Sequence, residues 1–267
     1  MRRIVLLIAC FILFTSHELF LKSNSYYLKP DTNSELYLYN GSFNKSENTI
    51  SRDRIVNAMI LGPEYKFSPS PDDYHEQGEV TYLNFKTGNE GTYVAGISTL
   101  PREIELSSQE FLEYLKHGGL HEMIAERKEK GLSGKAAREE YSKHVKAILQ
   151  VSGKKTTHYD IALGYPIEFI PLSNPYELKI GDILAIRLLK DGEELKKQTI
   201  HYSLQTQAGE DPLEVKSTKT DKDGLFSITI DKPGIWYVAT IHMEESNTPG
   251  IDYVSNWATL TFEIRHS

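Results

Sequence analysis

The sequence predicts a mainly β protein with two Ig-like or transthyretin-like antiparallel β-sandwich domains and a helical insert between them. Three observations predict this fold class. The 267-residue chain contains 16 Tyr and 10 Phe, which favour strands. Short runs in both halves alternate in polarity and are separated by turn sequences. Apolar residues in the middle of the chain recur at helical spacing instead.

The beginning of the chain has the organisation of a secretory signal. Two arginines precede an apolar run from Ile4 to Phe14, which is too short for a permanent membrane-spanning helix. We expect residues 1–16 to be removed, leaving a protein of the periplasm or cell envelope with no integral membrane segment. Cleavage after Ser16 would make His17 the first residue, although Phe14 occupies a position where a small residue is preferred.

A lipoprotein signal is the competing interpretation. The sequence Leu7-Ile8-Ala9-Cys10 has the form of a lipoprotein cleavage box, which would acylate Cys10 and place His17 inside a tether. We favour it less, because only nine residues precede Cys10 and the apolar run continues beyond it.

Cys10 is the only cysteine, so a chain that has lost residues 1–16 contains none. Such a chain would have to hold a metal with nitrogen and oxygen donors.

Two regions of alternating sequence predict the sandwiches. In residues 17–103, runs such as 35–39 and 91–95 alternate between turn sequences and indicate the N-terminal β-sandwich domain. In residues 158–267, the runs 183–189, 225–230, 235–240 and 258–264 indicate a C-terminal Ig-like β-sandwich domain.

Residues 104–157 are predicted to form the helical insert. Ser107 and Glu110 have the spacing of a capping box, and apolar residues follow at helical spacing. We expect a second helix from His121 to about Lys130. A third is expected from Lys135 to Gln150, since its apolar residues share one stripe: Ala137, Tyr141, Val145, Ile148 and Leu149.

Charge and motifs exclude several functions. Loss of the signal's two arginines moves the formal charge from −7 to −9, so we expect no nucleic-acid partner and no general attraction to anionic membranes. The chain has no Gly-x-Ser-x-Gly motif and no glycine-rich phosphate loop. We therefore expect a protein that is not an enzyme.

Four histidines are candidate metal ligands: His17, His117, His144 and His242. His17 would offer an α-amino group and an imidazole in one chelate. His117 and His121 have a spacing that places two imidazoles on one helical face, but the intervening glycines are expected to end that helix, so a solvated pair is the simpler interpretation. His144 lies between charged neighbours, and His242 follows an apolar strand; a lone histidine at such a position is more often structural.

Several segments together resemble the DUF4198 family, which is grouped with the NikM-like periplasmic components of nickel and cobalt transport. The resemblance covers nearly the whole mature chain, in order, and rests on residues 17–21, 87–93, 141–146, 164–176, 234–237, 241–243 and 255–262. It implies extracytoplasmic metal handling, with His17 and His242 as the positions most like the family's metal ligands. Some relatives carry a histidine-rich loop where residues 205–211 of this chain contain no histidine.

The leading hypothesis is a protein that binds a divalent transition metal, nickel, cobalt or copper, and presents it to a membrane metal transporter. His17 would provide two nitrogens, His242 a third, and His144 or His117 a fourth. Because neutral imidazoles are required, binding should weaken as the pH falls through roughly 6.5. The alternative is a metal-free, non-enzymatic cell-envelope module that binds a glycan or a protein. A copper oxygenase ranks last, because the sequence supplies no recognisable substrate face.

Overall fold

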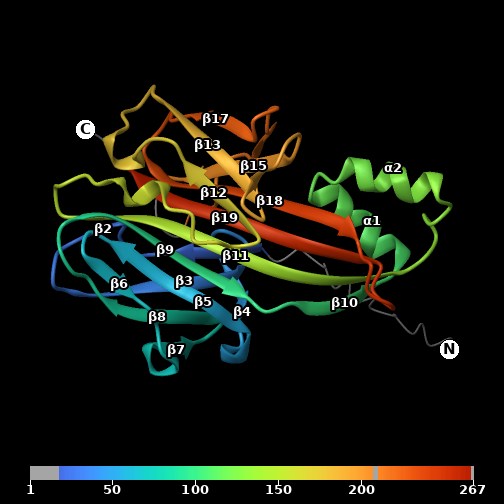
Figure 1. Ribbon diagram of the computed structural model, residues 1–267, viewed down its shortest axis with the longest axis horizontal. Helices are drawn as coiled ribbons and strands as arrows, with labels where there is room; N and C mark the ends of the chain where they lie inside the picture. The colour runs from blue at the N-terminus through green and yellow to red at the C-terminus, as the bar shows by residue number, and fades with distance from the viewer. Residues whose placement is uncertain (1–17, 207–209, 266–267) are drawn as a thin grey trace, which may run out of the picture.

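The structure is a computed structural model that describes residues 18–206 and 210–265. It confirms the mainly β fold, with three sheets and two short helices among the described residues (Figure 1). The five-stranded sheet has the order β1 (Glu18–Lys22), β3 (Asn33–Gly41), β8 (Val80–Lys86), β7 (Tyr74–Gln77), with β4 (Ser46–Asn48) paired to β3.

A ten-stranded sheet forms the centre of the molecule. Its order is β16 (Lys216–Lys219), β15 (Thr199–Gln205), β18 (Gly234–Glu245), β19 (Tyr253–Ile264), β11 (Ala137–Val151), β9 (Gly91–Thr99), β5 (Ile55–Gly62), β6 (Tyr65–Phe67), and β10 (Arg102–Leu106) and β2 (Tyr27–Leu28) also pair with β11. The four-stranded sheet contains β12 (Ile167–Pro171), β13 (Ile183–Lys190), β14 (Glu193–Glu194) and β17 (Leu225–Thr229).

The predicted third helix is wrong, because its residues form the long strand β11. This strand pairs in parallel with β19 and antiparallel with β9. The stripe residues Ala137, Tyr141 and Val145 are four apart, a spacing that fits the period of two in a strand as well as a helical turn. From Ser142 to Val151 every residue is buried, so the central position of β11 overrides its helical propensity.

β11 connects strands from both regions that were predicted to be separate sandwiches. β5, β6 and β9 come from residues 17–103, and β15, β16, β18 and β19 come from residues 158–267. The two regions therefore share one sheet, with β11 in the middle (Figure 1). The domain boundaries at residues 103 and 157 stay predictions.

The two other predicted helices are confirmed as α1 (Ser108–His117) and α2 (His121–Glu129). The capping box forms as expected: the Glu110 N–H donates to Ser107 Oγ at 3.3 Å, and the Ser107 N–H donates to the Glu110 carboxylate at 2.8 Å. Both helices lie at one end of β11, β18 and β19 (Figure 1). There α1 packs through Phe111 and Leu115, and α2 through Met123, in one cluster with Tyr253.

In the part of the chain that the structure describes, the connections contain four single-turn 3-10 helices: η1 (Arg52–Arg54), η2 (Pro71–Asp73), η3 (Thr157–Asp160) and η4 (Pro175–Glu177). The largest core cluster contains residues from all three sheets.

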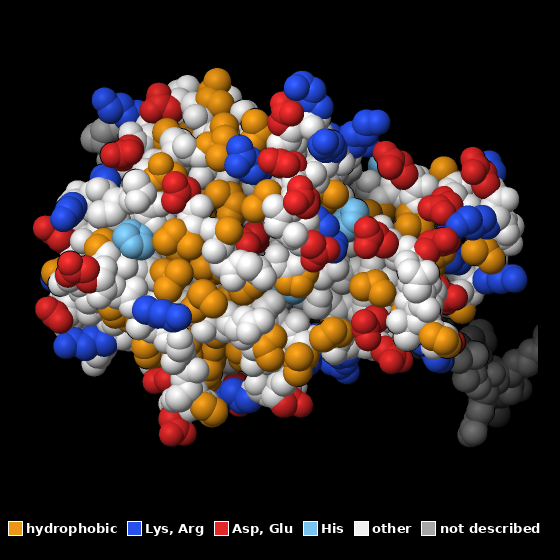
Figure 2. All heavy atoms as spheres, in the orientation of Figure 1, with side chains coloured by type: hydrophobic (Ala, Val, Ile, Leu, Met, Phe, Trp, Pro, Cys, Tyr) orange, Lys and Arg blue, Asp and Glu red, His pale blue; other side chains and the backbone are white. Residues whose placement is uncertain are grey.

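On the face shown in Figure 2, acidic and basic side chains are interspersed over the surface, in keeping with a chain of modest net charge. No helix within the described ranges is long and apolar enough to cross a membrane.

Candidate functional site

The candidate site is a cavity of about 540 Å³ where β1, the β3–β4 turn, the end of α1 and β15 meet, which we call the histidine cavity. Two histidines and two carboxylates contribute to its wall: His117, His201, Glu18 and Glu47. The remainder is lined mainly by aromatic, aliphatic and hydroxyl side chains.

The turn after α1 brings His117 to the strand that carries His201. α1 ends where Gly119 adopts a φ of +68°. His201 packs directly against this turn, with Nε2 3.4 Å from the carbonyl oxygen of Gly118 and Nδ1 2.9 Å from Ser217 Oγ. A Cβ on Gly119 would lie only 3.1 Å from His201 Nε2, so the close approach depends on glycine.

The surroundings of His201 favour its neutral form. Burial lowers the pKa of His201, and the neighbouring His117 and His121 lower it further, whereas the hydrogen bond with Gly118 acts in the opposite direction. A neutral imidazole is the form that binds metal ions, so His201 has the protonation state of a ligand at neutral pH.

Aromatic rings form the apolar side of the histidine cavity. Phe20, Phe43 and Tyr237 contact one another, and the centroid of the Phe43 ring is 4.9 Å from that of Phe20 and 4.5 Å from that of Tyr237. Burial raises the pKa of Glu18 at the cavity wall to about 7, and the nearby Lys143 opposes this rise. The cavity therefore combines imidazole nitrogens with a carboxyl group that ionises close to neutral pH.

Of the four predicted ligands, His17 lies outside the described residues, and His117 lines the histidine cavity as an exposed side chain. His144 is buried on β11 and has both ring nitrogens engaged. Its Nδ1 contacts Ser98 Oγ, and its Nε2 lies 3.1 Å from both Ser142 Oγ and Asn256 Oδ1. Burial lowers the pKa of His144, and its contacts are those of a neutral, structural imidazole.

His242 lies on the other face of β18 from the histidine cavity. Alternation along the strand places Tyr237 on the cavity side and His242 on the opposite side. There His242 Nδ1 is 2.9 Å from Gln198 Oε1, and Nε2 is 3.1 Å from Glu244 Oε1. The fold brings together His117 and His201, but it does not bring His242 to them.

Within residues 18–206 and 210–265, no group of three or more His, Cys, Asp or Glu side chains is arranged to hold a metal ion. The histidine cavity by itself therefore offers an incomplete set of ligands. His201 was missed by the sequence analysis. It occurs in an ordinary strand, 84 positions after His117, so no local sequence signal pointed to it. The two histidines lie close together because His201 packs against the turn that follows α1.

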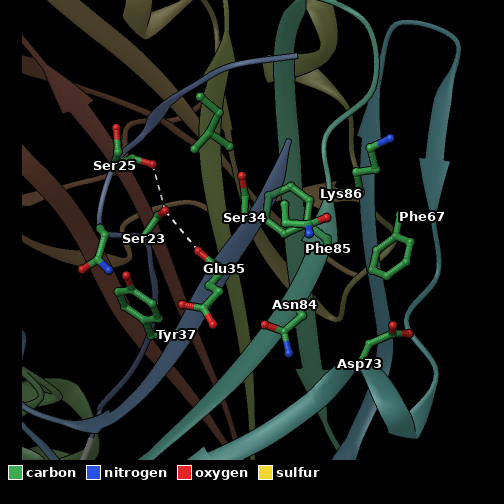
Figure 3. A pocket seen from close by; sticks show the side chains of 13 residues that line it. Ser23, Ser25, Ser34, Glu35, Tyr37, Phe67, Asp73, Asn84, Phe85 and Lys86 are labelled. Carbon is green, nitrogen blue, oxygen red and sulfur yellow. Dashed lines mark hydrogen bonds between the residues drawn. The ribbon is translucent and has the colours of Figure 1, made fainter. Parts of the chain in front are cut away.

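A second cavity, of about 690 Å³, lies between the five-stranded sheet and β6 (Figure 3). Asn84, Glu35 and Asp73 contribute polar groups to its lining, while Phe67 and Phe85 contribute rings. Amide and carboxyl groups beside aromatic rings are suited to hydroxyl-rich ligands. We call this site the polar groove.

Comparisons with solved structures give weak similarities. The D0-D1 domain of intimin aligns at 9% identity and a TM-score of 0.20, over 92% of this chain and 97% of that one. Salmonella alpha-2-macroglobulin reacted with methylamine aligns at 9% identity and a TM-score of 0.23, over 93% of this chain and 15% of that one. These scores carry no functional argument.

No curated protein matches the chain. A family model does match it over residues 14–244, which include most of the three sheets and both helices. That family is described as a domain of unknown function. The protein belongs to the DUF4198 family.

Proposed function

We propose that this is an extracytoplasmic protein that binds a divalent transition metal at the histidine cavity and presents it to a membrane uptake transporter. Nickel, cobalt and copper are the ions best suited to imidazole and amine nitrogens. The role proposed is binding and delivery, without catalysis.

The observation that supports the proposal is the meeting of His117 and His201 beside Glu18. Glu18 is the residue that follows His17 in the sequence. In a chain cleaved after Ser16, one peptide unit of about 3.8 Å would separate the Cα of His17 from that of Glu18. We propose that the α-amino group and imidazole of His17 supply two further nitrogens, which together with the two cavity histidines would make four.

Calorimetric titration of Ni²⁺ into the chain beginning at His17 tests this assignment. His201→Ala and His117→Ala should each weaken binding by about tenfold or more, the effect of losing one ligand or its support. His242→Ala is the matched control on the opposite face of the sheet and should leave the affinity unchanged. Equal affinities for the wild type and His201→Ala would reject the site, and a loss confined to His242→Ala would move it to β18.

The polar groove favours a second candidate function, a metal-free module that binds a glycan or a protein of the cell envelope. Its amide and carboxyl groups, including Asn84 and Asp73, provide donors and acceptors for hydroxyl groups. Glycan-array binding by the metal-free protein that is lost in Asn84→Ala would establish this function. No bound glycan, together with Ni²⁺ binding at the histidine cavity, would exclude the glycan-binding form and support the first proposal.

A further inference from the structure

A third cavity concentrates positive charge at the junction of β4, η1, β10 and β11. Its volume is about 320 Å³, and its basic lining residues are Arg54, Arg102 and Lys143. Glu79 is the acidic side chain in this lining. We call this site the arginine cavity. It is separate from the histidine cavity, with which it shares no lining residue.

The strand pairing explains why these cations meet. Arg102 lies opposite Tyr141 in the antiparallel pair of β10 and β11. Tyr141 is also covered by Arg54, whose guanidinium carbon is 5.4 Å from the ring centroid. Lys143 is two residues further along β11, and its Nζ is 5.6 Å from the same ring. Arg54 and Lys143 thus both lie against the ring of Tyr141, and Arg102 lies on the residue opposite it in the strand pair.

The two arginines lack carboxylate partners in the part of the chain that the structure describes. Neither Arg54 nor Arg102 forms an ion pair there, whereas the neighbouring Arg52 pairs with Glu76 at 3.0 Å. The guanidinium of Arg54 donates one hydrogen bond, from Nη2 to the Leu100 carbonyl at 3.2 Å. Its Nε–H is buried without an acceptor among the described residues, which is an unfavourable state for a charged donor.

The surroundings of Lys143 lower the pKa of its ammonium group. Burial lowers the pKa of Lys143 to about 7, and the positive charges of Arg54 and Arg102 add to this effect, while Glu18 and Glu139 oppose it. Lys143 Nζ donates to Asn40 Oδ1 at 2.9 Å, so the amide fixes the ammonium group at the cavity wall. A negative ligand at this wall would offset the mutual repulsion of the cations.

We propose that the arginine cavity binds a small multivalent oxyanion, a dicarboxylate or a phosphate, through Arg54, Arg102 and Lys143. Guanidinium groups bind planar carboxylates and phosphates through paired, charge-assisted hydrogen bonds. A volume of about 320 Å³ is at the small end of ligand sites, which suits a compact anion and excludes a large one. The hydroxyl of Ser51 and the amide of Asn48 complete a polar wall.

Calorimetric titration of succinate and of inorganic phosphate into the metal-free full chain, at low ionic strength, tests the proposal. Neither probe requires a metal, so the titration can be made without a metal ion at the histidine cavity. Binding should weaken as salt is added. Arg102→Gln changes an exposed side chain and should preserve the fold; it should weaken binding by about tenfold, the effect of losing one charge-assisted contact. Arg54→Gln should weaken it similarly.

Arg52→Gln is the matched control, because Arg52 belongs to the same 3-10 helix but does not line the cavity. It should bind as the wild type does, and glycerol, a neutral polyol, should not bind at all. Binding of one probe alone would identify the oxyanion as a carboxylate or a phosphate. Absence of binding by both probes at millimolar concentration, or equal weakening in Arg102→Gln and Arg52→Gln, would overturn the proposal.

Discussion

The Nζ of Lys146 lies 2.9 Å from a carboxylate oxygen of Glu168, and their side chains are only 1% and 3% exposed. This buried ion pair joins the central strand β11 to β12. The carboxylate of Glu168 also accepts backbone N–H bonds from Leu163 and Gly164, at 2.8 and 2.9 Å. The pair therefore fixes the loop before β12 on the ten-stranded sheet.

Removal of one partner should be strongly destabilising. Lys146→Met leaves the carboxylate of Glu168 buried without its cation and is expected to lower the free energy of unfolding by about 3–5 kcal/mol. Urea denaturation measures the change. The double variant Lys146→Met, Glu168→Gln should recover much of the loss, because an amide oxygen can accept the backbone N–H bonds without a charge. A single variant as stable as the wild type would contradict the assignment.

Glu139 should make stability depend on pH. The residue is 2% exposed, and burial raises the pKa of its carboxyl group, while hydrogen bonds from Ser255 and from Tyr114 oppose the rise. Between its ordinary value of 4.5 and the raised pKa, the folded protein retains a proton that the unfolded chain loses. The contribution of Glu139 to stability is therefore fully present below pH 4.5 and is lost as the pH rises toward the folded pKa.

The matched measurement compares the wild type with Glu139→Gln across this pH range. The amide keeps the acceptor oxygen but does not ionise, so the variant should gain stability relative to the wild type as the pH rises from 4.5 to neutral. Unfolding free energies at several pH values give this difference directly. Two parallel curves would show that Glu139 titrates normally.

Arg127 should hold α2 against the sheet. Its guanidinium donates to the Tyr253 hydroxyl at 2.9 Å and to the carbonyls of Leu132 and Lys135 at 2.8 and 2.7 Å. Arg127→Lys cannot reproduce this planar set of bonds and should lower stability by about 1.5–3 kcal/mol. Amide hydrogen exchange across residues 121–129 should accelerate. The exposed Arg138→Lys is the control and should change stability by less than about 0.5 kcal/mol.

Comparing Gly119→Ala with Gly131→Ala should distinguish the effect of backbone strain from an effect on the position of His201. The φ of Gly119, +68°, resembles that of Gly131, at +67°, so alanine at either position should lower stability by about 1–3 kcal/mol. Only at Gly119 would the new Cβ approach His201, whereas nothing lies within 4 Å of a Cβ at Gly131. We expect Gly119→Ala to weaken Ni²⁺ binding and Gly131→Ala to leave it unchanged. Similar affinities in the two variants would argue against His201 as a ligand.

Local signals in the sequence predicted much of the fold. The predicted runs became strands, as residues 91–95 did in β9, and Ser107 and Glu110 marked the start of α1. Such signals act between residues that are close together in the chain, as in a capping box or a turn. These elements can therefore be predicted without knowledge of the rest of the chain.

The long strand β11 could not be predicted from local sequence. Its stripe of Ala137, Tyr141 and Val145 suits a helix and a strand equally, and the choice between them depends on the pairing of β11 with β19 and β9. Burial of Lys146 was equally hidden, because it requires Glu168 to arrive from a different sheet. Propensity is a weak bias that tertiary contacts override.

The sequence by itself determined the strand-rich class, the two short helices and the family resemblance, all of which follow from residues close together in the chain or in fixed order along it. Only the tertiary structure decided which histidines share a cavity. It placed His201 beside His117, buried His144 among hydroxyl and amide groups, and put His242 on the opposite face of β18. A site built from distant segments depends on sheet pairing and on side-chain direction along a strand, and neither is fixed by local sequence.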